Sequence, residues 1–480
     1  MIASSTLLRI ILAVSLQSPE AAVPRFERGP CRPAVREGER VDCGMLVVPE
    51  NRDVSGSSLI KVPVKIFRSR SANPLDDPIV FMLGGPGGST RNTTGVGMPF
   101  LDNRDYIVVD QRGTRLGEPA LACTGVDSVR SRMAHGTLSG SAAEAELTRS
   151  AGECATQLRK KGIDLDGYHS RAIAADLEDL RRVLGIKRWN LYGVSYSVRV
   201  MLIAMREHPE TIRSAFLDSP LSLESRYDEV AANSVIRALN IVIDACLASA
   251  SCAQKHPQVR TNLSKAVERF DAQPQWVVLD SAKTDSIFVT GAVLASAFTA
   301  LLNSPSSAAA LPLVVDRAAN GDIKALTGIF GEEVQRGGYT TGMRLAVWCS
   351  EVMPFQDRAA ITAQSNRELG LGGMFTAVIP PAGCDSMRIK PGPASDGAAV
   401  KSDIPTLILS GEIDAYVPTP WARSMLANMP RAFVLEVKGA GHGPGFSDCG
   451  QKVAFEFFND PTRVPATDCL AKGRGVQFTR

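Results

Sequence analysis

Short runs of apolar residues alternate with amphipathic stretches through the first 220 residues, and turn-rich breaks separate them. The runs at 78–83, 105–110, 189–192 and 214–218 have the length and apolar character of buried strands. Between the second and third runs, apolar residues recur at spacings of four, three and four, which predicts a helix that stops at Gly185: Ile173, Leu177, Leu180 and Leu184. This alternation predicts a mostly parallel sheet flanked by helices.

The pattern changes after residue 220. From 221 to 400 the sequence has Ala-rich helical segments and a tail that contains Gly and Pro, which is typical of an inserted, mainly helical cap. Strand-like runs return at 405–410 and 432–437, each followed by a Gly-containing loop. A chain of 480 residues also exceeds what one hydrophobic core usually supports. We therefore predict an α/β domain built from residues 23–220 and 401–480, with a cap at 221–400.

Charge and cysteine content limit the classes of function. The 53 Lys and Arg and 50 Asp and Glu residues leave a net charge of +3 with no basic block, so nucleic acid is not an expected partner. The ten cysteines are widely spaced and include no Cys-x-x-Cys pair, which favours disulfides over a metal site. Buried free thiols are the alternative. Neighbours such as Cys246 and Cys252 could pair, but the spacing does not fix the connectivity.

The N-terminus favours export. Arg9 precedes an apolar run at 10–16, which has the size of a signal-peptide core and is too short to span a bilayer. Residues 1–22 are therefore predicted to be a signal peptide, and we expect a periplasmic or secreted protein with no other membrane association. A cytosolic protein with a frayed N-terminus is the alternative, because the segment lacks a clean small-x-small cleavage site.

The segment Gly193-Val194-Ser195-Tyr196-Ser197 follows a predicted strand and opens a helical stretch. A serine hydroxyl is a weak nucleophile at neutral pH, and a strained strand-to-helix turn can present it to a neighbouring base. Ser195 is therefore the candidate nucleophile. Ser197 stands where this motif usually has a second glycine, so a tighter turn or altered packing is expected. On its own, the motif could also be an ordinary structural turn.

Two later residues supply partners for that serine. An α/β-hydrolase needs nucleophile, acid and histidine in this chain order, each just past a strand end. Asp414 follows the strand at 405–410, and His442 lies between two glycines after the strand at 432–437. Glu412 is a rival for the acid, and Asp414 could instead cap a helix. The order predicts an α/β-hydrolase fold with Ser195 as nucleophile, His442 as base and Asp414 as the acid that orients it.

Two backbone N–H groups usually stabilise the oxyanion of acyl transfer. One candidate donor is Tyr196, directly after the nucleophile. The other is Gly85, within the run Gly-Gly-Pro-Gly-Gly at 84–88 that ends a predicted strand. A phosphate-binding loop is the competing interpretation, but no Gly-Lys-Ser/Thr follows and the glycine spacing is not Gly-x-Gly-x-x-Gly.

Four segments together resemble the prolyl iminopeptidase and tripeptidyl aminopeptidase branch of the α/β-hydrolases: 83–89 (Leu-Gly-Gly-Pro-Gly-Gly-Ser), 110–114 (Asp-Gln-Arg-Gly-Thr), 193–196 and 411–414. The similarity covers most of the mature chain. Exported bacterial members of the tripeptidyl aminopeptidase group are similar in length, in paired cysteines and in a Cys-bearing segment after the histidine. One departure is Leu83, where iminopeptidases commonly carry His.

The resemblance implies a serine aminopeptidase that releases residues or short peptides from free peptide N-termini through an acyl-enzyme, beneath a helical cap. Such an enzyme must neutralise the substrate ammonium, and a carboxylate in the cap is the physical solution. Glu351, in Trp348-Cys349-Ser350-Glu351, is the candidate; an exposed Glu beside a structural cysteine is the alternative interpretation.

Two other functions remain open. The same triad could serve a carboxylesterase, a lactonase or a small-amide hydrolase, for which Glu351 would be irrelevant. The chain could also be a non-catalytic binding protein on a hydrolase fold. Ser197 in place of the usual second glycine of the motif is the feature that suggests this alternative. The expected partner is a peptide or a small ester or amide substrate, and none of the three hypotheses requires a metal or an organic cofactor.

Overall fold

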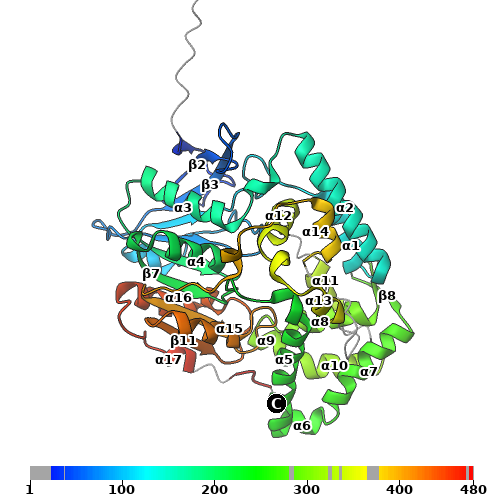
Figure 1. Cartoon of the computed structure of the whole chain (residues 1–480). Coiled ribbons are helices and arrows are strands. Elements are labelled where there is room, and N and C mark those ends of the chain that lie inside the picture. Colours follow the sequence, from blue (N-terminus) through cyan, green and yellow to red (C-terminus); the bar gives the residue numbers. More distant parts are fainter. Residues whose placement is uncertain are drawn as a thin grey trace, which may run out of the picture.

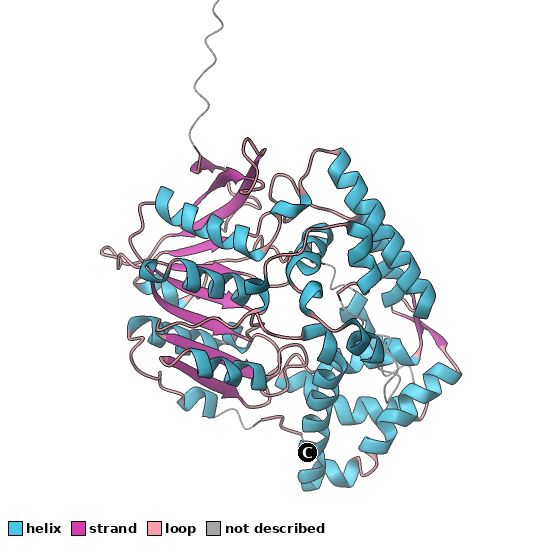
Figure 2. Ribbon diagram, in the orientation of Figure 1, coloured by secondary structure: helices cyan, strands magenta, loops and turns pink. Residues whose placement is uncertain are grey.

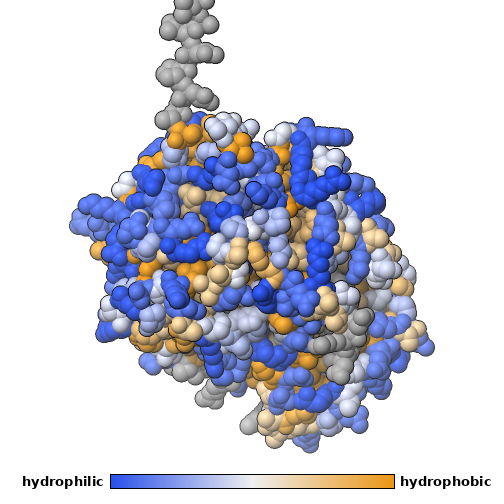
Figure 3. All heavy atoms as spheres, viewed as in Figure 1, coloured by the Kyte–Doolittle hydropathy of each residue, from blue (hydrophilic) through white to orange (hydrophobic). Residues whose placement is uncertain are grey.

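The computed structural model describes residues 23–36, 38–279, 286–322, 327–334, 338–364, 378–471 and 475–478. The predicted signal peptide, residues 1–22, therefore lies outside the described residues. Figure 1 places the sheet and its flanking helices on the left and the cap helices on the right. The surface in the same view is mostly polar, and its apolar side chains form smaller patches (Figure 3).

A sheet in the order β1-β2-β3-β5-β4-β6-β7-β10-β11 forms the central layer (Figure 2). Parallel pairing joins β5, β4, β6, β7, β10 and β11, as the sequence predicts. At one edge of the sheet, β1, β2 and β3 pair antiparallel, and the sequence did not predict these three strands. The bounds are β1 (Arg25–Gly29), β2 (Val41–Pro49), β3 (Leu59–Phe67), β4 (Ile79–Met82), β5 (Tyr106–Val109), β6 (Trp189–Val194), β7 (Ile212–Asp218), β10 (Thr406–Gly411) and β11 (Ala432–Val437).

The central parallel strands are buried along their whole length because helices cover both faces of the sheet. Every residue of β4, β5 and β6 is buried, which explains their continuous apolar sequences. One core contains residues of α3 (Ser170–Val183), α4 (Ser197–Glu207) and α15 (Thr419–Ser424). A second core, on the other face, joins the sheet to α16 (Asp448–Asn459) through aromatic pairs such as Phe216 with Phe458.

The region after β7 is mainly helical and has its own apolar core. It contains α5 (Tyr227–Ala248), α6 (Ala250–Lys255), α7 (Val259–Ala272), the hairpin β8 (Gln275–Val278) and β9 (Ser286–Val289), α8 (Gly291–Leu301), α9 (Pro305–Ala308), α10 (Leu311–Ala319), α11 (Thr327–Val334), α12 (Thr341–Glu351), α13 (Arg358–Gln364) and α14 (Pro381–Met387). Two earlier helices, α1 (Thr124–Ala134) and α2 (Gly140–Lys160), pack against α12 and α14. A short helix, α17 (Asp468–Ala471), follows α16. The borders of the domains stay a prediction.

Within the described ranges, α5 is the helix that is long and apolar enough to cross a membrane. Its side chains Val235, Leu239 and Val242 are buried in the core of the cap. Packing of this kind is expected of a core helix in a folded domain.

All ten cysteines form disulfides, as their spacing suggests: Cys31–Cys43, Cys123–Cys154, Cys246–Cys252, Cys349–Cys384 and Cys449–Cys469. Two of these bonds, Cys246–Cys252 and Cys349–Cys384, lie within the predicted cap, residues 221–400. Cys123–Cys154 joins the start of α1 to α2, and Cys349–Cys384 joins α12 to α14. Cross-links of this kind stabilise the fold chiefly by restricting the unfolded chain.

Candidate active site

Ser195 lies in the turn between β6 and α4, and its backbone adopts a left-handed conformation with φ of 58°. Such a conformation is uncommon for a residue other than glycine and is typical of strained functional turns. Gly193 permits this turn, because a Cβ there would lie 2.7 Å from Cγ of Met201 on α4. Strand and helix therefore approach closely, and the Ser195 side chain is left partly exposed.

Ser197 replaces the usual second glycine without opening the turn. Its hydroxyl accepts a hydrogen bond from Val194 N at 2.8 Å and lies 2.7 Å from Met82 O, to which it donates. The side chain is fully buried. Ser197 therefore ties the start of α4 to β4 and β6, so the departure from the motif is a packing feature.

Asp414 and His442 meet beyond the carboxyl ends of β10 and β11. The Nδ1 of His442 lies 2.8 Å from Asp414 Oδ2, and because an ionised carboxylate only accepts hydrogen bonds, Nδ1 carries the proton. The other oxygen of Asp414 accepts from the backbone N–H groups of Tyr416 and Val417, both at 2.9 Å. Glu412, the rival acid, instead binds Lys438 Nζ and Gly439 N.

The electrostatics of this pair suit a base and its orienting acid. Burial alone would raise the pKa of Asp414, but the imidazole of His442 and the two backbone donors hold it below its usual value. Burial would lower the pKa of His442, but the Asp414 carboxylate, with help from Asp218, raises it above the usual 6.5. The imidazole is therefore prepared to accept a proton.

The dipeptide Asp218-Ser219, at the end of β7, connects the nucleophile turn to the histidine loop. Ser195 N donates to the backbone oxygen of Asp218 at 2.9 Å. On the other side, Gly443 N donates to Ser219 Oγ at 2.9 Å, and Gly445 N donates to Asp218 Oδ2 at 3.0 Å. One short segment therefore holds the turn that carries Ser195 and the loop that carries His442 side by side.

The glycine-rich loop after β4 packs directly on the nucleophile turn. A Cβ on Gly84 would lie 2.8 Å from Ser195 Cβ and 3.2 Å from Tyr196 N, so this contact requires glycine. Gln111 holds the loop from behind, because its Nε2 donates to Leu83 O at 2.6 Å and its Oε1 accepts from Gly87 N at 2.8 Å. Among the described residues, no backbone oxygen accepts from Gly85 N or Tyr196 N.

The predicted role of Glu351 as an ammonium ligand is wrong. Its side chain is 1% exposed, and its carboxylate accepts hydrogen bonds from Ser170 and lies 3.3 Å from Nε of Arg199. Ser170 Oγ is also 2.7 Å from the hydroxyl of Tyr196. Glu351 therefore belongs to a buried network behind Tyr196, where a substrate cannot reach it.

Two residues that support the site are absent from the sequence-based prediction. The sequence pattern places Asp218 only at the end of a strand, although an acid at the carboxyl end of a buried strand beside the nucleophile strand is a usable signal. Arg237, on α5, donates to the backbone oxygens of Glu412 and Asp414 at 2.9 and 2.7 Å. Nothing in the local sequence marks Arg237, because its role depends on how the cap sits on the sheet.

Replacing Asp218 by Asn is expected to move the acid limb of the kcat/KM profile to lower pH. The limb reports protonation of His442, and activity falls as pH drops through its pKa. Burial raises the pKa of Asp218 to about 7 against the opposing charge of His442, and Asp414 adds to the rise. The Tyr192 hydroxyl also faces this carboxyl, and its pKa is raised by burial and by Asp218. The amide of the variant still accepts from Gly445 N but no longer stabilises the imidazolium.

The control for this change is Asp244→Asn, at an exposed position on α5. It removes one negative charge from the protein without touching the loop of His442. The kcat/KM profiles of both variants are compared with that of the wild type, and an equal shift in the two contradicts the prediction.

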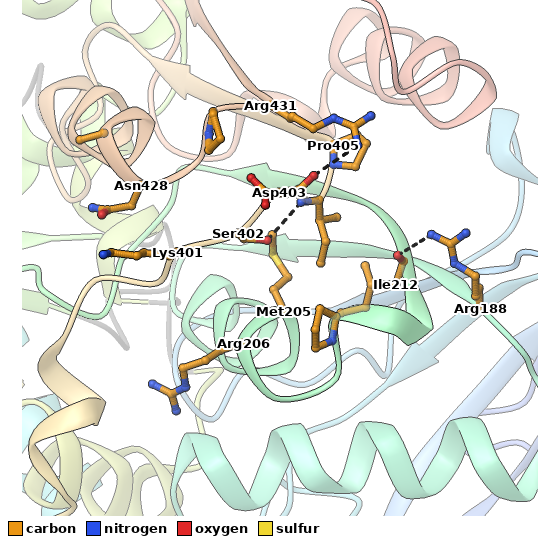
Figure 4. Close-up of a pocket in the computed structure, with 14 residues that line it drawn as sticks. Arg188, Met205, Arg206, Ile212, Lys401, Ser402, Asp403, Pro405, Asn428 and Arg431 are labelled. Carbon is orange, nitrogen blue, oxygen red and sulfur yellow. Dashed lines mark hydrogen bonds between the residues drawn. The ribbon is translucent and has the colours of Figure 1, made fainter.

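A pocket of about 780 Å³ lies at the opposite end of the strands (Figure 4). It is lined near the starts of β7 and β10, with Arg188, Arg206, Lys401 and Arg431 around it. In open α/β sheets, reactive groups gather instead at the carboxyl ends of the strands. This pocket is therefore separate from the candidate triad. The described residues contain no cluster of His, Cys, Asp and Glu that could hold a metal ion.

Comparisons with known proteins found two family models that match parts of this chain. A family model for the alpha/beta hydrolase fold matches residues 77–240, and a model for TAP-like protein matches residues 373–469. The proteins named serine protease Hip1 from Mycobacterium tuberculosis and Mycobacterium bovis are each 24% identical to this chain, over 89% of it and 86% of their own length. A solved α/β fold family hydrolase from Bacillus anthracis is 13% identical, covers 87% of this chain and 99% of its own, and has a TM-score of 0.41. The chain is therefore a serine hydrolase of the α/β-hydrolase fold, and its C-terminal part is TAP-like.

Proposed function

We propose that this hydrolase is a serine peptidase in which Ser195, His442 and Asp414 form the catalytic triad. The observation that carries the proposal is the arrangement at the strand ends: His442 Nδ1 donates to Asp414 Oδ2, while Asp218-Ser219 ties the histidine loop to the turn of Ser195. Nucleophile, acid and base thus come from the carboxyl ends of β6, β10 and β11, and the end of β7 lies between the first two.

In the proposed reaction, Ser195 Oγ attacks the scissile carbonyl and His442 Nε2 takes its proton. The carbonyl oxygen becomes an oxyanion, and the N–H groups of Gly85 and Tyr196 donate to it. His442 then gives the proton to the leaving amine, and water repeats the cycle on the acyl-enzyme. Asp414 stays ionised throughout and stabilises the imidazolium.

Two observations support a peptide substrate. The relatives at 24% identity are named serine protease, and the C-terminal part matches a TAP-like family model. We propose, more finely, an aminopeptidase that acts on free peptide N-termini, which rests on the resemblance of the glycine-rich loop and the triad motifs to the aminopeptidase branch. The group that would hold the substrate ammonium is not Glu351.

Hydrolysis of esters is the second candidate. The burial of Glu351 favours it, because the carboxylate expected to distinguish a peptidase from an esterase is inaccessible to substrate. The same triad and oxyanion donors serve both reactions.

Matched substrates separate the two functions. For an aminopeptidase, kcat/KM for a peptide with a free N-terminus is expected to exceed that for its N-acetylated form by about 10- to 100-fold, because the acetylated form loses a charge-assisted hydrogen bond. The measurement is release of the N-terminal fragment, with p-nitrophenyl esters assayed in parallel. Equal rates on free and blocked peptides contradict the aminopeptidase; turnover of esters alone contradicts any peptidase.

We also propose that the protein works in an oxidising compartment outside the cytoplasm. Five disulfides that use every cysteine support this location, because such bonds are rare in cytosolic proteins.

A further inference from the structure

The start of α12 in the cap lies directly on the oxyanion loop. Thr340 N donates to the backbone oxygen of Gly87 at 2.9 Å. The preceding residue, Tyr339, is so close to the loop that a Cβ on Gly85 would lie 3.0 Å from Cδ1 of its ring. The Tyr339 side chain is 48% exposed. Side chains on this turn of α12 are therefore neighbours of the place where the substrate carbonyl binds in the proposed reaction.

Arg344 extends from this turn of α12. Its guanidinium lies over the ring of Tyr339, 4.7 Å from the ring centroid. The side chain is partly buried, and its Nε has no hydrogen-bond partner although it is shielded from solvent. Among the side chains that the structure describes, which leave out those of residues 331–334, no carboxylate lies within ion-pair distance of Arg344. This arginine therefore presents unused donors one aromatic ring away from Gly85.

Arg344 also interacts electrostatically with Tyr227, on α5. Burial raises the pKa of Tyr227, the charge of Arg344 opposes that rise, and Tyr416 and Asp414 add to it. Tyr227 thus lies within electrostatic range of both Arg344 and Asp414. The Tyr416 ring in turn packs edge-on against His442, with 5.5 Å between ring centroids. The contact that places Arg344 at the site is therefore the one through Tyr339 and the oxyanion loop.

The charged groups around Arg344 do not neutralise it by direct contact. Asp228 interacts electrostatically with Arg344, but its carboxyl accepts from Trp348 Nε1 and Gln356 Nε2. A second arginine, Arg130, is close enough for the charge of Arg344, together with burial, to lower its pKa to about 10.

Arg130 is also incompletely paired. It donates to Val378 O, and its Nε lacks a partner. Asp127, which partly offsets its charge, accepts from the hydroxyl of Thr341. The two arginines are therefore offset only in part, because Asp127 and Asp228 act on them electrostatically but direct their own hydrogen bonds to other groups. Burying a cation whose hydrogen-bond donors have no partner destabilises the folded protein, and a bound anion offsets this cost in free energy.

We propose that Arg344 is a specificity-determining residue that binds a carboxylate of the substrate close to the scissile carbonyl. The substrate class is then an acyl or peptidyl compound with a carboxylate near the reacting bond. In a peptide that carboxylate is either an Asp or Glu side chain or the C-terminus of a short substrate. Arginine suits this role because its planar guanidinium binds carboxylates in a bidentate manner. The inference rests on the proposed acyl transfer at Ser195, but not on a preference for either end of a peptide.

Three matched substrate pairs test the inference and separate the sources of the carboxylate. The first is the p-nitrophenyl monoester of glutarate against p-nitrophenyl butyrate. The second is a C-terminally amidated peptide with Glu against Gln next to the cut bond. The third is a dipeptide with a free C-terminus against its amide. In each pair, kcat/KM of the wild-type protein for the carboxylate form is divided by that for the neutral form.

The variants are Arg344→Gln, Arg344→Lys and the control Arg431→Gln, which lies at the opposite end of the strands (Figure 4). The wild type is expected to prefer the carboxylate form by about 10- to 100-fold in at least one pair, the usual range for a charge-assisted hydrogen bond. Arg344→Gln removes this preference without lowering kcat/KM for the neutral partner, Arg344→Lys restores part of it, and Arg431→Gln retains it.

A preference in the first or second pair identifies an acidic group on the chain of the substrate, and a preference in the third alone identifies a C-terminal carboxylate. No preference in any pair, or a preference that survives Arg344→Gln, overturns the inference. Turnover confined to the esters contradicts the proposed peptidase but still tests Arg344 through the first pair. If no substrate is turned over, the readout is the rate at which a fluorophosphonate labels Ser195, and failure of glutarate to slow it more in wild type than in Arg344→Gln overturns the inference.

Discussion

Replacing Ser195 by Ala is expected to lower kcat by about 10⁶-fold and to leave the fold intact, because the oxyanion donors and substrate binding alone give only a small residual rate. The side chain of Ser195 is partly exposed, and alanine keeps the Cβ, so the change removes only the hydroxyl. The measurement is turnover of any substrate found for the wild type, with the thermal midpoint and circular dichroism as checks on folding.

A fluorophosphonate probe provides the complementary measurement. It is expected to label the wild type once, at Ser195, and not to label Ser195→Ala. Ser306→Ala, at an exposed serine of the cap, is the matched control and should be labelled like the wild type. A folded wild-type protein that stays unlabelled would contradict the nucleophile and would favour a binding protein on a hydrolase fold.

Replacing Asp414 by Asn is expected to lower kcat by about 10⁴-fold, the second largest effect. The amide no longer fixes the proton on Nδ1 of His442, and it cannot stabilise the imidazolium that forms when Ser195 is deprotonated. Because the Asp414 carboxylate raises the pKa of His442, the acid limb of the remaining activity should also move to lower pH. The kcat/KM profile measures both effects.

The chain contains a matched control for this change two residues earlier. Glu412 binds Lys438 and Gly439 through its carboxylate and does not contact His442. Glu412→Gln is therefore expected to keep kcat within about threefold of the wild type, since exposed ion pairs contribute little. Equal losses in the two variants would contradict the assignment of the acid to Asp414.

Local sequence was sufficient for the parallel strands and for the position of each candidate triad residue just after one of them. Strands buried on both faces are continuously apolar, so β4, β5, β6, β7 and β10 stand out. β11 is half-buried at the edge of the sheet but is also mostly apolar, and Ser195, Asp414 and His442 each follow one of these strands. The antiparallel edge is not recognisable in the same way. β2 carries Asp42 and Gly44 within its apolar run and is only partly buried, so its pattern is not distinctive.

The environment of single side chains was less predictable than their position. Glu351 was expected to face substrate because a disulfide and an aromatic residue flank it, and both flanking features are present. Its direction is decided by Arg199 on α4 and Ser170 on α3, residues more than 150 positions away, which draw the carboxylate inward. A buried charge is stable only beside such partners, and no local pattern reveals them.

The sequence by itself determined the parallel strands, the turn at Ser195, the glycine-rich loop and the candidates for acid and base, because each depends on residues close together in the chain. Only the tertiary structure decided that Asp414 rather than Glu412 meets His442, that Asp218-Ser219 joins the loops of nucleophile and base, and that Glu351 is buried against Ser170 and Arg199. The physical reason is that the distances between side chains, their burial and their electrostatic interactions depend on how segments far apart in the sequence pack together. The local pattern of apolar and polar residues does not determine that packing.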